Sequence, residues 1–191
     1  MTIYTNLVSV LWLLLVLFWL VSALFAKKSA VQRINWQRTI WFRVLLIIAV
    51  VLVVRTQSAQ HTAVTVLTFS FTNPIINLLG VILCAAGIGL AVWARVYLGR
   101  NWGMPMSLRQ GHELVTTGPY RFIRHPIYSG ILLAALGSVL ASTAWWLFLF
   151  LAYGGYFFYS VGVEEKMMME QFPDQYPAYK TKTKRLIPFI Y

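Results

Sequence analysis

Residues 127–163 read IYSGILLAALGSVLASTAWWLFLFLAYGGYFFYSVGV, two apolar runs interrupted only by Ser142 and Thr143. The runs cover residues 127–141 and 144–163 and contain no charged side chain. A helix needs about 20 apolar residues to cross the hydrocarbon of a bilayer. A break this short permits only a tight turn. The pattern therefore predicts a hairpin of two antiparallel membrane helices whose outer ends reach the same membrane face.

Three further apolar runs precede this pair. They cover residues 7–26, residues 40–54 (or 34–54 if the arginines within it extend to the interface) and residues 75–98. Residues 63–71 are apolar but too short to span, so we expect an interfacial or re-entrant segment there. With 59% hydrophobic and 11% charged residues, the composition is that of a polytopic membrane protein. The predicted fold class is all-α, with about five transmembrane helices.

We expect one integral-membrane domain over residues 1–191. Residues 1–74 supply N-terminal helices and the interfacial segment, and residues 75–191 form the core that we expect to carry the functional site. Asn73-Pro74 is a typical helix start for the third long helix. In that helix, glycines at positions 80, 87 and 89 predict a face for close helix packing. The single cysteine, Cys84, lies among apolar residues and is expected to serve packing.

The distribution of charge predicts the orientation. If the N-terminus faces outward, fifteen of the sixteen Lys and Arg residues lie at the inner face and only Arg55 lies outside. The net charge of +11 then reflects topology and attraction to anionic membrane lipids, and nucleic-acid binding is not favoured. The expected location is a bacterial inner membrane or the endoplasmic reticulum, with the C-terminus and the functional site cytoplasmic.

Polar residues gather at the inner face in the C-terminal half. Residues 118–130 read GPYRFIRHPIYSG, and all five carboxylates lie after residue 100. The predicted hairpin brings together His112, Glu113, Tyr120, His125, Tyr128, Glu164 and Glu165. A helix beginning at Pro126 would present free backbone amides that favour an anionic group. Glu164 or Glu165 would suit an ammonium group, and the two tyrosines would suit a flat ring or a cation.

Simpler interpretations exist for each of these residues. Tyrosines at a membrane edge usually form the aromatic belt, and Arg121 and Arg124 are typical topology determinants. The basic segment 179–185 is expected to be a solvated end facing the lipid head groups. A metal site is not favoured, because no His-x-x-x-His or cysteine pair is present. Adjacent carboxylates on a helix point about 100° apart, so we expect only one of Glu164 and Glu165 to face a ligand.

Several motifs resemble those of one enzyme family. They are Trp93-Ala-Arg95 with Leu98-Gly-Arg-Asn-Trp102, His112-Glu-Leu-Val115, Thr117-Gly-Pro-Tyr120, Arg124-His-Pro-Ile-Tyr128, Glu164-Glu165, and Phe172, Tyr176, Tyr179 and Ile187-Pro188. In order and spacing they resemble the isoprenylcysteine carboxyl methyltransferases, integral-membrane enzymes related to the phospholipid N-methyltransferases. The resemblance covers about residues 90–191. It implies S-adenosylmethionine as cofactor, bound by His112, Glu113, Leu114, Val115, Tyr120, His125, Pro126, Ile127, Tyr128 and Glu164.

One departure concerns the acceptor. The family usually has an arginine four residues before the first glutamate, associated with the acceptor substrate, and this chain has Ser160 there. An arginine is the natural bidentate partner of a carboxylate. Arg95, Arg100 or Arg121 could take its place, or the acceptor is not a carboxylate. We assign Arg95, Trp102 and Ser160 to the acceptor side of the site.

The resemblance implies methyl transfer to a lipophilic acceptor, an isoprenylcysteine-type carboxylate or a related lipid. A carboxylate needs no base, whereas an amine or hydroxyl would give its proton to His125, Glu164 or Glu165. We expect the acceptor to enter from the bilayer and the cofactor from the aqueous side. The alternatives are a phospholipid or amine N-methyltransferase, an NADPH-dependent membrane reductase, and a membrane protein that binds the cofactor without catalysis.

Overall fold

The computed structural model describes residues 3–24, 44, 48, 71–102, 113–143 and 145–188. Five helices lie in these ranges: α1 (Ile3–Leu24), α3 (Pro74–Leu98), α4 (Pro126–Ala141), α5 (Trp145–Gln171) and α6 (Tyr176–Lys182). Two 3₁₀ turns, Gly99–Asn101 and Gly118–Arg121, join them. An isolated parallel bridge pairs Ile123 with Lys184, and the described ranges contain no strand. The all-helical prediction is confirmed for these residues.

Three of the described helices, α1, α3 and α5, are long and apolar enough to cross a membrane. The fourth, α4, is apolar but has only 16 residues. The chain is an integral membrane protein, as predicted. The predicted helix over residues 40–54 lies outside the described residues except for positions 44 and 48, and the segment 63–70 lies outside them entirely. A total of five spans therefore stays a prediction.

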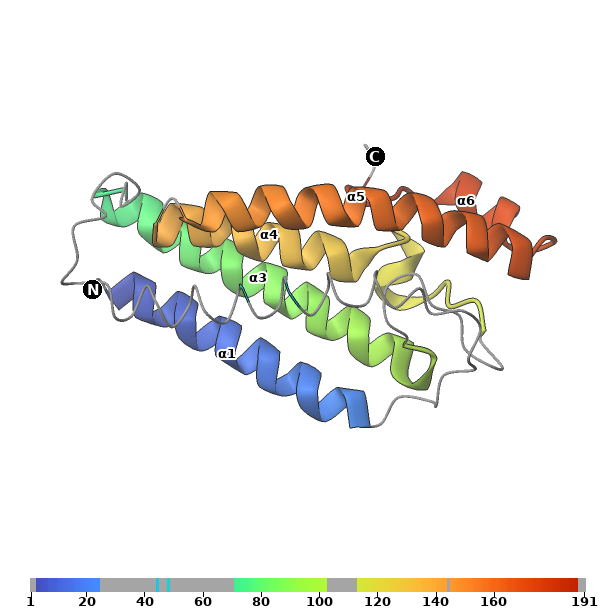
Figure 1. Cartoon of the computed structure of the whole chain (residues 1–191), viewed down its shortest axis with the longest axis horizontal. Coiled ribbons are helices and arrows are strands. Elements are labelled where there is room, and N and C mark those ends of the chain that lie inside the picture. Colours follow the sequence, from blue (N-terminus) through green and yellow to red (C-terminus); the bar gives the residue numbers. More distant parts are fainter. Residues whose placement is uncertain are drawn as a thin grey trace.

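The helices pack side by side, with α4 between α3 and α5 and with α1 against α3 and α4 (Figure 1). Helices α1, α3 and α5 run in one direction and α4 runs in the other (Figure 1). The last residues of α3 and α5 therefore lie at the same end of the bundle as the first residues of α4. All the described polar residues predicted to form the site belong to this end.

Two helix starts follow from proline. Asn73 caps α3 through its side-chain oxygen, which accepts a hydrogen bond from the Ile75 amide at 2.9 Å, and Pro74 occupies the first helical position. Pro126 likewise begins α4 after His125. Proline fits a first turn because its missing N–H would have no partner there. Both prolines stood at these places in the sequence, so both starts were predictable.

Glycines bring α3 and α4 into backbone contact. A Cβ atom built on Gly80 would lie 2.6 Å from the Gly137 carbonyl oxygen, and one on Gly87 would lie 2.5 Å from that of Gly130. The reciprocal positions on α4 are equally close. Gly89 has open space around it. The predicted packing face of α3 is thus confirmed at positions 80 and 87 and wrong at position 89, which points away from α4.

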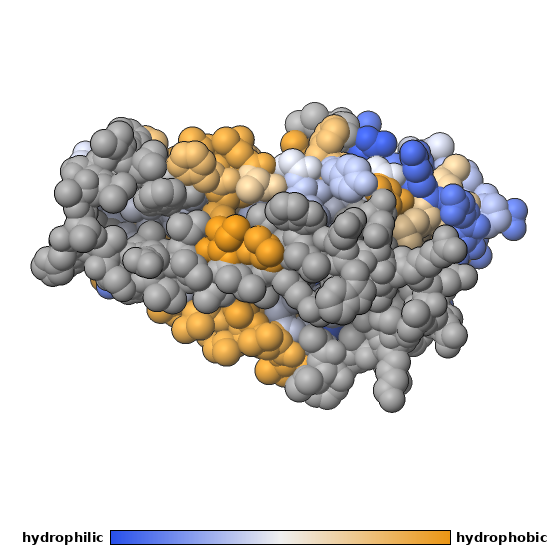
Figure 2. Space-filling view, in the orientation of Figure 1, coloured by the Kyte–Doolittle hydropathy of each residue, from blue (hydrophilic) through white to orange (hydrophobic). Residues whose placement is uncertain are grey.

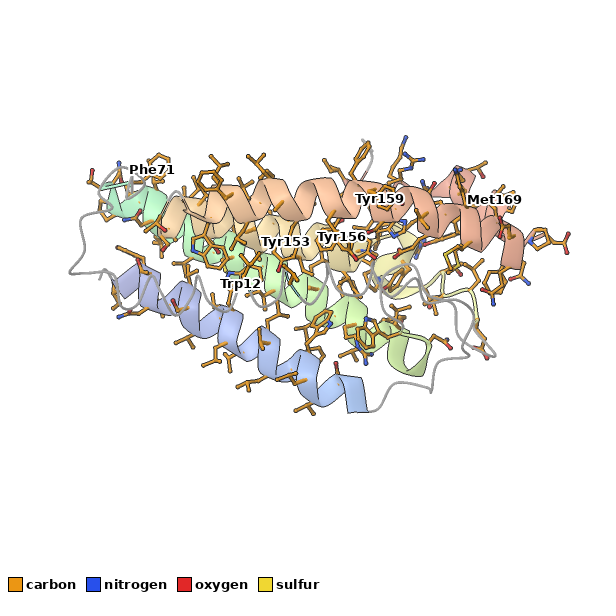
Figure 3. All side chains as sticks on the ribbon, viewed as in Figure 1. Trp12, Phe71, Tyr153, Tyr156, Tyr159 and Met169 are labelled. Carbon is orange, nitrogen blue, oxygen red and sulfur yellow. The ribbon has the colours of Figure 1, made fainter. Side chains whose placement is uncertain are left out.

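Helix α1 is attached through Trp12. Its ring stacks on Trp146 with centroids 5.1 Å apart, and its indole N–H donates to Ser138 Oγ at 3.0 Å. Ser138 in turn lies 3.6 Å from the sulfur of Cys84, which is fully buried. Figure 3 shows Trp12 projecting from α1 toward the other helices. The packing role predicted for Cys84 is confirmed.

The outer surface divides by polarity along the bundle. Apolar residues cover the visible parts of α1 and of the first half of α5, and hydrophilic residues gather around α6 (Figure 2). Large exposed side chains on these helices include Leu13, Leu17, Leu20, Leu151 and Phe158. Exposed apolar side chains at this density suit contact with lipid. The end that carries α6 is therefore polar and suits contact with water.

Candidate functional site

The predicted cofactor residues fall into three groups. His112 lies outside the described residues. Glu113 is exposed and Leu114 and Val115 are half-buried, in a non-helical segment before the turn at residues 118–121. The remaining residues lie at the start of α4, in the turn before it, or near the end of α5, and these positions are Tyr120, His125, Pro126, Ile127, Tyr128 and Glu164. This third group forms the candidate site.

Glu164 is the centre of the site. Its Oε1 accepts a hydrogen bond from the Tyr128 hydroxyl at 2.5 Å, and its Oε2 lies 3.3 Å from His125 Nδ1. The turn-like start of α4 at Pro126 places the histidine and the tyrosine on the side facing α5, so both reach the same carboxylate. The structure therefore brings together three of the residues that the sequence singled out.

The aromatic rings behind Glu164 are stacked. The His125 and Tyr128 rings are parallel within 2°, with centroids 5.5 Å apart, and Tyr128 lies 4.3 Å from Phe157 of α5. Stacking fixes the plane of each ring. His125 Nε2 is buried and makes no hydrogen bond to any described residue. Phe157 was not predicted, and its apolar surroundings in the sequence gave no signal of its place beside Tyr128.

Glu165 has different partners. It is almost fully buried, and Arg124 places Nε and Nη2 each 2.8 Å from its Oε1. Arg185 Nη2 lies 3.2 Å and Lys180 Nζ 3.5 Å from Oε2. The two neighbouring carboxylates thus have different main partners, although His125 Nε2 also lies 4.0 Å from Glu165 Oε1. That only one of them faces a ligand stays a prediction. Arg124 is more than a topology determinant, because its guanidinium is the main partner of a buried carboxylate.

The chain after α6 binds the start of α4. The amides of Arg124 and His125 donate to the carbonyls of Lys184 and Arg185 at 2.8 and 3.1 Å, and Ser129 Oγ donates to the Leu186 carbonyl at 2.5 Å. The amide of His125 itself is therefore paired, and free amides in the first turn after Pro126 stay a prediction. The prediction of a solvated tail holds for the exposed side chains at positions 182 and 184 but not for the backbone, which pairs with residues 122–125.

Tyr120 is buried next to a second tyrosine. Its hydroxyl donates to the Ala94 carbonyl at 3.4 Å, and the Tyr179 hydroxyl donates to the Tyr120 carbonyl at 2.7 Å. Burial raises the pKa of Tyr120 well above its usual value, and the neighbouring Tyr179 adds to the shift. Burial also raises the pKa of Tyr179 to about 12. Both phenols are neutral at physiological pH and act as hydrogen-bond donors.

The residues assigned to the acceptor side make internal contacts. Arg95 donates to the carbonyls of Ser22 and Gly99 at 2.6 and 2.9 Å, and its guanidinium lies 4.5 Å from the Trp102 ring centroid. It therefore links the end of α3 to the end of α1. Ser160 is fully buried, and its hydroxyl donates to the Tyr156 carbonyl one turn earlier at 2.8 Å. An acceptor role for these residues stays a prediction.

The fold and the site define a class of protein: an integral-membrane protein whose helix ends bring polar and aromatic side chains together at one end of the bundle. The sequence model of the phospholipid methyltransferase family matches residues 75–175. This is more than half of the chain, and the chain belongs to that family. The family-level resemblance to membrane methyltransferases is confirmed.

Two of the individual relatives are named as methyltransferases, and a third is named as a resistance protein. The chain is 29% identical over 130 residues to protein-S-isoprenylcysteine O-methyltransferase of Saccharomyces cerevisiae, covering 65% of this chain and 54% of the relative. It is 30% identical over 122 residues to the cobalt-zinc-cadmium resistance protein CzcN of Cupriavidus metallidurans, covering 62% and 52%. It is 33% identical over 70 residues to methanethiol S-methyltransferase 1 of Bradyrhizobium diazoefficiens, covering 37% and 24%. The chain thus spans about half the length of the first two relatives and a quarter of the third.

Proposed function

We propose that this chain is an S-adenosylmethionine-dependent methyltransferase that acts on a lipophilic acceptor held in the bilayer. The observation that carries the proposal is the meeting of Glu164, Tyr128 and His125 at the aqueous end of the bundle. These residues lie within the segment matched by the family model. The cofactor-binding set that we propose is the one predicted from the sequence, with Glu164 as its main charged member.

The residues present fit such a cofactor. The Glu164 carboxylate suits the ammonium of an amino-acid group, and the ring of Tyr120 suits a sulfonium, because ring quadrupoles attract cations. The buried Nε2 of His125 offers a further hydrogen-bonding position, since it makes no hydrogen bond to a described residue and lies 4.0 Å from Glu165 Oε1. Tyr128 keeps Glu164 in place, because its hydroxyl donates to the carboxylate while its ring packs on Phe157.

The bound cofactor supplies a methyl group activated by a positive sulfur. The chain holds the two reactants in line and excludes water from the site. These two effects account for most of the rate acceleration in a reaction of this geometry. Phe157 and Tyr128 shield one side of the Glu164 carboxylate from water. Arg124 and Arg185 are bound to Glu165 and leave Glu164 as the carboxylate that faces the aromatic side of the site.

The acceptor that we propose first is an isoprenylcysteine-type carboxylate, after the printed activity of the yeast relative. A carboxylate is already ionised, so no protein base is required. A phospholipid or amine acceptor is the second candidate. The description of the matched family favours this second candidate. So does Ser160, which stands where the family usually has an arginine and whose buried hydroxyl bonds within its own helix. An amine would have to lose a proton, and the Glu164–His125 pair lies where it could be taken up.

For the orientation we propose that the N-terminus faces outward and that the end carrying α6 faces the cytoplasm. The described cations at this end, among them Lys180, Lys182, Lys184 and Arg185, support it through the positive-inside rule. The water-soluble cofactor would then enter from the cytoplasm. The acceptor would enter sideways from the bilayer, and in a bacterium that bilayer would be the inner membrane.

A methyl-transfer assay tests the proposal. The protein is reconstituted in vesicles with labelled S-adenosylmethionine and one acceptor at a time: a farnesylated cysteine, an amino-headgroup phospholipid, or a long-chain thiol. We expect label in one of the three lipids, and none with Glu164→Ala. The same variant made at exposed Glu170 of the same helix should keep activity. Absence of transfer to all three acceptor classes would contradict the proposed activity.

A further inference from the structure

The segment after α5 lies across the start of α4. We name residues 176–188, which include α6, the C-terminal strap. Its backbone accepts hydrogen bonds from the amides of Arg124 and His125, and Ser129 Oγ bonds to its Leu186 carbonyl. At its other end Tyr179 donates to the Tyr120 carbonyl. These contacts begin and end beside the residues of the candidate site.

One carboxylate pairs with two of the charged side chains of the strap. Glu165 receives Lys180 and Arg185 from the strap and Arg124 from the turn before α4. Arg124 also donates through Nη1 to the carbonyls of Lys180, at 3.1 Å, and of Thr183. Three cations therefore meet at one negative group. Without that group they would repel one another and separate the strap from α4.

The cations differ in their access to water. The Arg124 side chain is 6% exposed, whereas those of Arg185 and Lys180 are 34% and 41% exposed. Water can therefore compete for the strap's two cations while Arg124 remains buried on Glu165. Separation of the strap would break the Arg185 and Lys180 contacts first and leave the Arg124–Glu165 pair in place.

We propose that Glu165 is a positioning residue that holds the C-terminal strap against the start of α4, and that the strap forms one wall of the cofactor site. The second half rests on the proposed function. Glu165 acts through the strap, since Arg124 precedes His125 directly and Ser129 follows Tyr128 directly. A strap that separates would free the amide of His125 and remove the support of both sides of the site.

Hydrogen exchange on the intact detergent-purified protein tests the first half. In Glu165→Gln we expect the amides of Arg124 and His125 to exchange about tenfold faster, which is the effect of losing roughly one hydrogen bond to a charged group. Exchange in α3 should stay unchanged. Arg185→Gln should show a smaller increase, and Glu170→Gln, on the exposed side of α5, should show none.

Two results would overturn the positioning role. One is unchanged exchange at Arg124 and His125 in Glu165→Gln. The other is faster exchange throughout α3 and α4, because Glu165 would then stabilise the whole bundle rather than the strap. Either result is read from the same spectra, so the variant and its effect on the fold are judged together.

Binding of S-adenosylhomocysteine tests the second half. We expect it to slow exchange at Arg124 and His125 in the wild type, and its Kd to rise about tenfold in Glu165→Gln with no change in Glu170→Gln. Wild-type binding with an unchanged Kd in Glu165→Gln would exclude the strap as a wall of the site while leaving the proposed function intact. Failure of the wild type to bind would contradict the proposed function, and the exchange data would still decide the role of Glu165.

Discussion

Replacing Gly87 with alanine should separate α3 from α4. The added Cβ would lie 2.5 Å from the Gly130 carbonyl oxygen, which is closer than Cβ atoms in real structures lie to a non-bonded heavy atom. The obstructing atoms belong to the backbone of α4, so no side chain can rotate away. The two helices must move apart by roughly 1 Å to restore ordinary contact. Overpacking of this kind costs about 1–3 kcal/mol.

The matched control is Gly89→Ala. It lies two residues away in the same helix and has no atom within 4 Å of its built Cβ. Alanine there should be neutral or stabilising by up to about 1 kcal/mol, because alanine is the better helix former. Thermal unfolding in detergent measures both variants. At roughly 2–4 °C per kcal/mol for a chain of this size, Gly87→Ala should lower Tm by about 2–12 °C.

Equal Tm values for the wild type and Gly87→Ala would refute this reasoning, and so would equal losses in the two variants. The first would mean that α3 and α4 do not touch through their glycines. The second would mean that glycine itself, rather than the contact, is what the helix needs.

The same substitutions should also affect the site. Because α4 begins with its ligand-facing residues, Gly87→Ala should weaken S-adenosylhomocysteine binding, and Gly89→Ala should not.

Three other changes have defined outcomes. Tyr128→Phe removes the donor to Glu164 and should raise the Kd for S-adenosylhomocysteine about tenfold or more in calorimetry, and it should lower the free energy of unfolding by about 1–3 kcal/mol because a mostly buried carboxylate loses its donor. Trp12→Phe removes the indole bond to Ser138 and should lower the free energy of unfolding by about 1 kcal/mol in detergent titrations, without affecting cofactor binding. The pKa of Tyr179 is raised from 10.0 to about 12, so its contribution to stability is complete below pH 10 and is lost as the pH rises toward 12. We expect Tyr179→Phe to lose less Tm than the wild type over that pH range. Identical pH profiles of Tm in the two proteins would contradict this.

The helices and part of the site were predictable from local sequence signals. Pro74 and Pro126 begin two helices because proline fits a first turn, and long apolar runs set the spans. The different main partners of Glu164 and Glu165 agree with the helical angle between neighbours. Local patterns of this kind need no knowledge of the tertiary structure, which is why they were correct.

Contacts between distant segments were not predictable. Arg124 and Glu165 are 41 residues apart in the chain, and nothing in either local sequence selects one as the partner of the other. The pairing of residues 122–125 with the strap depends on the strap's return to the start of α4, which only the fold determines. The same holds for the glycines of α4. Gly130 and Gly137 are present in the sequence, but only the structure shows that they face Gly87 and Gly80 of α3.

Calorimetric titration of the purified protein with S-adenosylhomocysteine is the most direct test of the central claim, that Glu164 anchors a methyl-donor site. The wild type and Glu170→Ala should bind with micromolar Kd, Glu164→Ala should lose binding, and NADPH titrated in parallel should give no heat. Binding that survives in Glu164→Ala would contradict the assigned site. Binding of NADPH in place of S-adenosylhomocysteine would contradict the methyltransferase proposal and favour a reductase.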